Sequence, residues 1–163
     1  MSEKNLLEGK RVLVVDDEPD VLDTLEDLLS ICDVERALSF TEAKEKLEAG
    51  GFDLVILDIM GVNGYALLDI ATEKEITAVM LTAHALSPED TIKSHKKGAA
   101  YYLPKEEMVN IEQHLNDVLQ AKAEGKSTWW RWFERFASFY ERKFGSDWQN
   151  KDKNYWDKFK NYY

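Results

Sequence analysis

The sequence predicts an α/β fold built on a parallel five-stranded sheet. Four short apolar runs, at 12–15, 54–57, 76–81 and 99–103, are typical of strands buried on both faces, and the first three are rich in Val, Ile and Leu. Residues 34–38 predict a shorter strand. Between them lie segments whose apolar residues recur at helical spacing. Such repeated strand–helix alternation favours parallel strands, right-handed crossovers and helices on both faces of the sheet.

Five helices are expected between and after these strands. Pro19 and Pro88 each suit a first helical turn, and Ser39 or Thr41 could cap the second helix, which Gly50-Gly51 would end. The expected helices cover roughly residues 19–31, 40–49, 65–72, 88–97 and 106–123.

Composition narrows the classes of function. The chain has 163 residues and a formal net charge of −10, which disfavours a non-specific nucleic-acid binder. Its single cysteine, Cys32, excludes an intrachain disulfide and favours a reducing cytoplasm. The N-terminal residues are not followed by an apolar signal region, and no apolar run approaches the ~18 residues of a membrane helix. We therefore expect a cytoplasmic protein.

The last 35 residues differ sharply from the rest. All five Trp, five of the seven Phe and four of the seven Tyr lie in residues 129–163, which carry a net +3, whereas residues 1–128 carry −13. A shift of this kind marks a boundary. We expect one domain at 1–124 and an aromatic-rich, helical C-terminal extension at 125–163.

Polar residues follow four of the predicted strands directly. They are Asp16 and Asp17, Asp58, Thr82, and Lys105. Because parallel strands end at the same edge of a sheet, these side chains are expected to gather there. Crowded carboxylates suit Mg²⁺, which prefers oxygen ligands and retains several waters. A carboxylate can also attack phosphorus, with a lysine and a hydroxyl positioned for the phosphoryl oxygens.

Four motifs resemble those of the response-regulator receiver domains of two-component signalling, the CheY-like superfamily. They are Val-Leu-Val-Val-Asp-Asp-Glu-Pro at 12–19, Leu-Asp-Ile-Met at 57–60, Leu-Thr-Ala at 81–83, and Gly-Ala-Ala-Tyr-Tyr-Leu-Pro-Lys at 98–105. Their order and spacing together are highly specific, and the resemblance spans about residues 10–122. It implies a flavodoxin-like three-layer sandwich with strand order 2-1-3-4-5.

The resemblance also implies a phosphoryl-transfer chemistry. By match of position, Asp58 would accept a phosphoryl group from a histidine kinase or a phosphotransfer protein. Thr82 and Lys105 would bind the phosphoryl oxygens. Tyr102 would be the aromatic switch residue whose rotamer follows Thr82.

The same resemblance implies a Mg²⁺ cofactor. Asp16 and Asp17 would hold the ion, helped by Asp58 and the main-chain carbonyl of Met60. The sequence departs from the family at two points, since Gly64 follows Asp58 after six residues instead of eight, with no Pro between, and Lys105 is followed by Glu106 instead of Pro. The loop after Asp58 is therefore expected to have its own geometry.

Two classes of function remain at this point. In the first, the chain is a phosphorylatable switch, not an enzyme, which signals through altered protein–protein contacts. In the second, it is an aspartyl-phosphate phosphatase of haloacid-dehalogenase type. That family needs an Asp-x-Asp motif after its first strand, and Asp16-Asp17-Glu18 lacks the second Asp at that spacing. The first class is therefore favoured.

The aromatic residues of the extension are spaced by three and four, as on one side of a helix. The first stripe comprises Trp129, Trp132, Phe133, Phe136, Tyr140 and Phe144, and a second follows Gly145-Ser146 from Trp148 to Tyr163. We expect an interface with a second copy or a partner protein through 129–163. A segment folded back onto the domain is the next interpretation, and an amphipathic tether at a membrane surface is the third.

Overall fold

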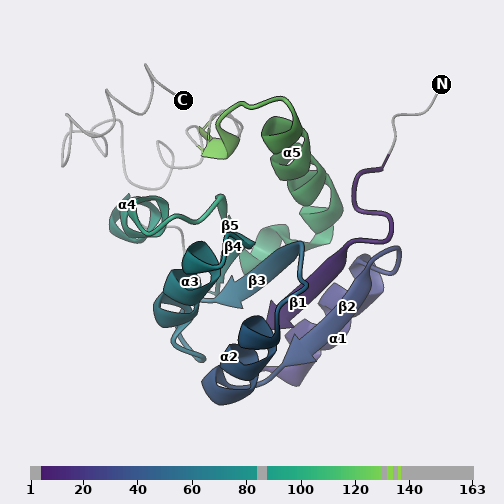
Figure 1. Ribbon diagram of the computed structural model, residues 1–163, viewed down its shortest axis with the longest axis vertical. Coiled ribbons are helices and arrows are strands. Elements are labelled where there is room, and N and C mark those ends of the chain that lie inside the picture. Colours follow the sequence, from purple (N-terminus) through teal and green to yellow (C-terminus); the bar gives the residue numbers. More distant parts are fainter. Residues whose placement is uncertain (1–4, 84–87, 130–131, 134–135, 137–163) are drawn as a thin grey trace.

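The computed structural model describes residues 5–83 and 88–129, together with Trp132, Phe133 and Phe136. Five parallel strands form one sheet in the order β2-β1-β3-β4-β5, as the resemblance implied (Figure 1). The strands are β1 Arg11–Val15, β2 Asp33–Ala37, β3 Leu54–Asp58, β4 Thr77–Thr82 and β5 Tyr101–Pro104. The predicted fold class is confirmed.

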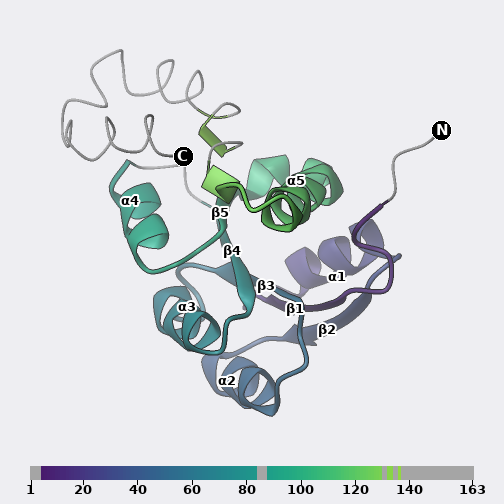
Figure 2. The ribbon, with the colours of Figure 1, turned by 45° about the horizontal axis from the view of Figure 1, so that its top comes forward.

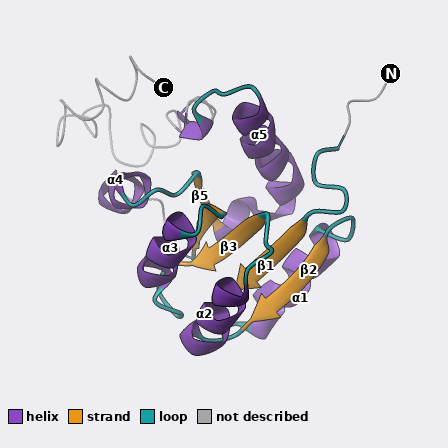
Figure 3. Ribbon diagram, in the orientation of Figure 1, coloured by secondary structure: helices purple, strands orange, loops and turns teal. Residues whose placement is uncertain are grey.

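Helices pack on both faces of this sheet, so the molecule has three layers. In Figure 2, α1 and α5 lie above the sheet, α2 and α3 lie below it, and α4 stands beside β5. Figure 3 shows the same helices in purple around the orange strands. Their bounds are α1 Pro19–Leu28, α2 Phe40–Ala49, α3 Gly64–Glu73, α4 Pro88–Lys96 and α5 Ile111–Ala123.

The strand register decides which residues meet at the carboxyl edge of the sheet. Val15 of β1 pairs with Leu57 of β3, so that Asp16 and Asp58 each follow this pair by one residue. Asp58 pairs with Leu81 of β4, and the next β4 residue, Thr82, pairs with Pro104 of β5. The central strands β3 and β4 are buried throughout, as their apolar composition predicts.

Local signals in the sequence fix several element ends. Pro19 occupies the first turn of α1, and the Ser39 side chain accepts a hydrogen bond from the Glu42 main-chain N–H at 3.2 Å, which caps α2. At the other end of α2, Gly50 adopts a φ of +80°, which favours glycine. The expected cap and stop of this helix are therefore present.

The last helix begins later than the sequence indicated. Residues Lys105–Asn110 form a 3₁₀ helix, η1, and α5 starts only at Ile111, whose N–H bonds to the Met108 carbonyl three residues back. A 3₁₀ turn closes by this shorter bond and is common at helix starts. The expectation of an α-helix from residue 106 is wrong for these first residues.

Three aromatic residues of the extension belong to the core. Trp129, Trp132 and Phe136 are buried against the domain, and Trp132 is 0% exposed. The described parts of this segment lie over β5 between α4 and α5 (Figures 1 and 2). These three residues therefore fold back, which was the second interpretation. Phe133 of the first stripe is partly buried against the same core. Tyr140 and Phe144, and the second stripe from Trp148 onward, lie outside the described residues.

No helix in the described part of the chain is long and apolar enough to cross a membrane.

Candidate functional site

Three of the predicted site residues meet at the carboxyl edge of the sheet. The Lys105 Nζ lies 2.8 Å from Asp16 Oδ2 and 3.5 Å from Asp58 Oδ1. Lys105 directly follows β5, Asp16 directly follows β1, and Asp58 is the last residue of β3. The parallel topology alone therefore brings the three side chains together. The two carboxylates share one ammonium group, which reduces the repulsion between them.

Asp58 is held in place by the loop that follows it. Asp58 is only 4% exposed, and its Oδ2 accepts a hydrogen bond from the Gly61 main-chain N–H at 3.0 Å. Directly after it, the Ile59 N–H bonds to the Leu81 carbonyl at 3.1 Å, which continues the ladder with β4. The second carboxylate oxygen, Oδ1, faces Lys105. The side chain is thus oriented before any ligand arrives.

A cluster of acids stands beside Asp58. One carboxylate oxygen from each of Asp16, Asp17 and Glu18 lies within 4.8 Å of the others. Asp16 is fully buried and accepts the Glu18 main-chain N–H at 2.9 Å, whereas Asp17 and Glu18 are exposed. Burial, and after it the nearby Asp58 charge, raises the pKa of Asp16 above its usual range, although Lys105 and the Glu18 N–H oppose this. A divalent cation would relieve such crowding.

Glu18 was not among the predicted site residues. Its Oε1 lies 3.3 Å from Lys105 Nζ, so the lysine touches three carboxylates. Burial by itself lowers the pKa of Lys105, but Asp16, Asp58 and Glu18 outweigh it and raise that pKa above its usual value. The lysine is therefore a fixed positive charge at this edge. The run of three acids at 16–18 was the signal that could have found Glu18.

Two glycines shape the short loop after Asp58. A Cβ on Gly61 would lie 2.4 Å from the Asp17 carboxylate, and a Cβ on Gly64 would lie 2.1 Å from the Asp58 main-chain oxygen. Between them, Asn63 takes the left-handed conformation with a φ of 54°. The loop thus closes in six residues because glycine lets both chain segments approach. No cis peptide occurs among the described residues, so Glu106 follows Lys105 through a trans bond.

The remaining predicted residues surround the same edge. Thr82 is buried and ends β4, one residue beyond the partner of Asp58. Tyr102 is fully buried within β5, and its main-chain carbonyl accepts the Trp132 indole N–H at 2.7 Å. Met60, which is 71% exposed, lies in the loop after Asp58. The expected switch pair therefore sits on the two neighbouring strands β4 and β5.

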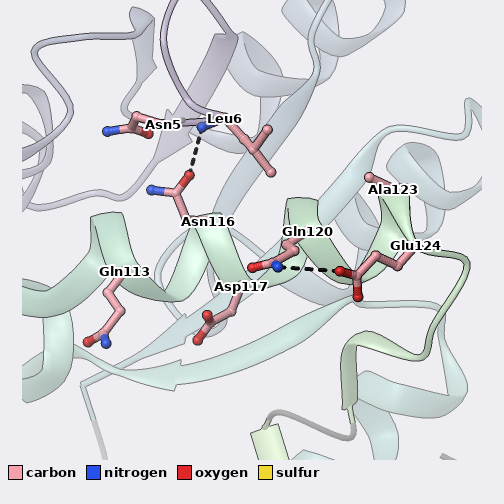
Figure 4. Close-up of a pocket in the computed structure, with 8 residues that line it drawn as sticks. All are labelled: Asn5, Leu6, Gln113, Asn116, Asp117, Gln120, Ala123 and Glu124. Carbon is pink, nitrogen blue, oxygen red and sulfur yellow. Dashed lines mark hydrogen bonds between the residues drawn. The ribbon is translucent and has the colours of Figure 1, made fainter. Parts of the chain in front are cut away.

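A separate hollow of about 620 Å³ lies elsewhere, between α5 and the N-terminal segment (Figure 4). Carboxamide and acidic side chains line it, and the Leu6 N–H bonds to Asn116 Oδ1 at 3.0 Å across its wall. It is open and contains none of the predicted site residues. The chemistry is therefore expected at the sheet edge, where the charged groups converge.

Comparison with known proteins identifies the family of the chain. The family model of the response regulator receiver domain matches residues 12–116. The chain belongs to this family. Two-component response regulator ARR18 of Arabidopsis thaliana is 37% identical to the receiver over 117 residues, which cover 66% of this chain and 18% of that regulator. The chain thus spans less than a fifth of that relative.

Solved structures give the same assignment. A CheY-like response regulator receiver domain protein from Methanospirillum hungatei JF-1 is 26% identical with a TM-score of 0.59, and the match covers 70% of this chain and 98% of that one. A response regulator from Burkholderia pseudomallei, solved with a phosphorylated aspartic acid, a calcium ion and citrate, is 25% identical with a TM-score of 0.56, over 70% and 72%. These matches do not support the haloacid-dehalogenase alternative. The receiver is a signalling domain of two-component response regulators.

Proposed function

We propose that this receiver accepts a phosphoryl group on Asp58 from a histidine kinase or a phosphotransfer protein. The observation that carries the proposal is the pre-oriented Asp58 carboxylate, with Gly61 N–H on one oxygen and Lys105 Nζ facing the other. In the transfer, an Asp58 oxygen forms a bond to phosphorus while the donor's bond to phosphorus breaks and the donor keeps that electron pair. Lys105 and the Thr82 hydroxyl are the groups proposed to bind the phosphoryl oxygens.

Mg²⁺ is the proposed cofactor. The acids that would hold it are Asp16 and Asp17, with Asp58 and the Met60 main-chain carbonyl completing the protein ligands. Two observations support this donor set: the oxygen cluster at residues 16–18, and the convergence of the Asp16 and Asp58 carboxylates on Lys105 at the same sheet edge. Few carboxylates, of which only Asp17 is exposed to solvent, leave room for the waters that Mg²⁺ retains. When bound, the ion supplies positive charge that offsets the negative charge of the phosphoryl oxygens.

We further propose that the phosphoryl group acts by changing protein–protein contacts, with residues 1–124 as the receiver unit and Thr82 and Tyr102 as the switch pair. Residues 129–163 of the extension are the proposed site of contact with a second copy or a partner, apart from Trp129, Trp132 and Phe136, which are buried against the receiver itself. The relationship to ARR18, a two-component response regulator, supports a signalling role in general terms.

Phosphorylation with a small donor tests the proposal. The full-length chain, incubated with acetyl phosphate and Mg²⁺, is expected to gain one phosphoryl group by intact-mass measurement, and chelation of Mg²⁺ should abolish the gain. Asp58→Asn should remove the modification because the nucleophilic oxygen is lost. Asp53→Asn is the matched control. Asp53 precedes the same strand at its other end, where its carboxylate accepts the Arg11 N–H at 2.9 Å, so this variant should be modified as fully as the wild type.

Undiminished phosphorylation of Asp58→Asn would place the acceptor elsewhere and contradict the proposal. A loss of modification in both variants would point instead to a general effect of removing a carboxylate at either end of β3.

A further inference from the structure

The first aromatic residues of the extension form a defined contact with the receiver. We call Trp129, Trp132 and Phe136 the aromatic anchor. Thr128, Trp129, Trp132, Phe133 and Phe136 are in helical conformation, and the three anchor residues are spaced to share one side of a helix. Ring centroids are 5.2 Å apart between Trp129 and Trp132 and 5.6 Å apart between Trp132 and Phe136. The anchor is thus one continuous aromatic unit.

The anchor is hydrogen-bonded to the edge of the sheet. The Trp129 indole N–H donates to the Ala99 carbonyl at 2.7 Å, and the Trp132 indole N–H donates to the Tyr102 carbonyl, also at 2.7 Å. β5 is the last strand of the sheet, and an edge strand presents main-chain groups that need partners. Two tryptophans therefore bind two carbonyls of one chain segment, one before β5 and one inside it.

Side chains from α4 and α5 complete the surface beneath the anchor. His95 of α4 meets the Trp129 ring nearly edge-on, with centroids 5.1 Å apart. His114 of α5 stacks on Phe136 at 5.8 Å, and its Nδ1 is hydrogen-bonded to the Tyr101 hydroxyl at 2.9 Å. The fit therefore depends on how α4, β5 and α5 are placed relative to one another.

The strand that holds the anchor leads directly into Lys105, a residue of the candidate phosphoacceptor site. Tyr102, which binds Trp132, is three residues before Lys105, on the order of 10 Å along an extended strand. Pro104 lies between them and pairs with Thr82 of β4. Lys105 now touches Asp16 and Glu18 as well as Asp58, so a phosphoryl group on Asp58 would compete for its ammonium group. Any resulting shift of Lys105 or Thr82 acts on β5 directly.

We propose that the aromatic anchor is an internal effector of the phosphoacceptor site, coupled to it through β5, so that loading Asp58 loosens the Trp132–Tyr102 contact. This inference rests on the proposed function of Asp58. Its direction follows from the fit, because the fully buried, hydrogen-bonded Trp132 is complementary to the unloaded arrangement and a moved β5 is less so. The coupling is reciprocal by linkage, and the anchor therefore opposes phosphorylation.

Indole hydrogen exchange in the full-length chain, with Mg²⁺ and with or without beryllofluoride as a phosphoryl mimic, tests the inference. Without the mimic, the assigned Trp129 and Trp132 indole protons should exchange slowly because both are buried in hydrogen bonds. With the mimic bound, exchange at Trp132 should accelerate by roughly 5- to 150-fold, the usual range of coupling between sites. Exchange at Trp129 should accelerate less, because its partner Ala99 precedes β5, at the end of the strand away from Lys105.

Substitution supplies the reciprocal measurement and a matched control. Trp132→Phe removes the bond to Tyr102 and keeps an aromatic ring, so it should tighten beryllofluoride binding by about the factor seen in exchange. Trp129→Phe removes the same kind of bond before β5 and should change that affinity at least threefold less. The exchange measurement uses the wild-type chain and does not depend on how the variants fold.

Three results would overturn the coupling. In the first, beryllofluoride shifts the NMR signals of Thr82 and Lys105 but leaves the exchange rate of the Trp132 indole proton unchanged. In the second, that exchange becomes slower when the mimic binds. In the third, Trp132→Phe and Trp129→Phe change the affinity for beryllofluoride equally. If the mimic causes no shift at Thr82 or Lys105 in the wild-type chain, the proposed function itself fails, and the coupling fails with it.

Discussion

The two glycines of the loop after Asp58 face obstacles of different kinds. At Gly61 the neighbour is the carboxylate of Asp17, the far end of a flexible side chain, whereas at Gly64 it is the main-chain carbonyl of Asp58. A side chain can rotate away at small cost, but a buried main-chain oxygen cannot. Alanine at each position should therefore have a different consequence.

We expect Gly61→Ala to displace Asp17 but to leave the free energy of unfolding near that of the wild type. The displacement should weaken Mg²⁺ binding by roughly tenfold or more, because loss of even an outer partner of a metal ligand typically lowers metal affinity 10- to 100-fold. Gly64→Ala should lower the free energy of unfolding by about 1–3 kcal/mol through overpacking. Urea unfolding and Mg²⁺ titration followed by NMR measure the two effects. Equal losses of stability in both variants would contradict the distinction.

At this scale the sequence could predict the acids and the lysine but not their partners. Asp16, Asp58 and Lys105 follow apolar runs, and strand topology alone puts them on one edge. The contact between Glu18 and Lys105, and the approach of Gly61 to Asp17, depend on the path of two loops. Loop paths are set by tertiary packing, which no local pattern encodes.

Among the elements, α4 contributes a titratable group beneath the anchor. Burial, and after it the charge of Lys96, lowers the pKa of His95 to about 4. The unfolded value is about 6.5, so between these values the unfolded chain binds the proton more tightly. The neutral histidine therefore contributes stability that is complete above pH ~6.5 and declines as the pH falls toward about 4.

We expect the free energy of unfolding to fall more steeply between pH 6.5 and 4 in the wild type than in His95→Gln, whose side chain does not titrate. Urea denaturation of both proteins at several pH values measures the difference, and carboxylates that titrate in the same range cancel in the comparison. Parallel pH profiles would show that His95 is not held in its neutral form.

Strands are marked more clearly in this sequence than the start of the last helix. All five strands lie within a residue or two of the expected runs. Four of them are buried on both faces and therefore leave continuous apolar stretches, whereas β2 at the sheet edge is only partly buried and mixes charged with apolar residues. The 3₁₀ helix η1 was missed because Glu106 to Asn110 also fit a helical pattern. Asn110 stands at the N-cap position of α5, but its side chain makes no capping hydrogen bond and donates to Glu107 instead.

For the molecule as a whole, composition predicted a boundary before the extension but not where the core ends. The charge and aromatic content change near residue 128, and this suggested a separate surface. Yet Trp129, Trp132 and Phe136 are buried in the same core as the sheet. A helical aromatic stripe does not reveal its partner, so an intermolecular contact and a folded-back segment gave the same pattern.

Two truncations separate the core from the rest of the extension. A chain ending after residue 137 keeps the aromatic anchor and should retain the urea midpoint of the full-length protein. A chain ending after residue 127 loses three buried aromatic side chains, each worth about 1.5–3 kcal/mol of burial, out of a typical total stability of ~5–15 kcal/mol. It should unfold at a much lower urea concentration or fail to fold. It should also self-associate in sedimentation, because the edge of β5 and the apolar surface between α4 and α5 become exposed.

The full-length triple variant Trp129→Ala, Trp132→Ala, Phe136→Ala should reproduce the loss of stability with the chain length unchanged. Equal midpoints for the two truncated chains would mean that residues 1–127 need nothing from the anchor.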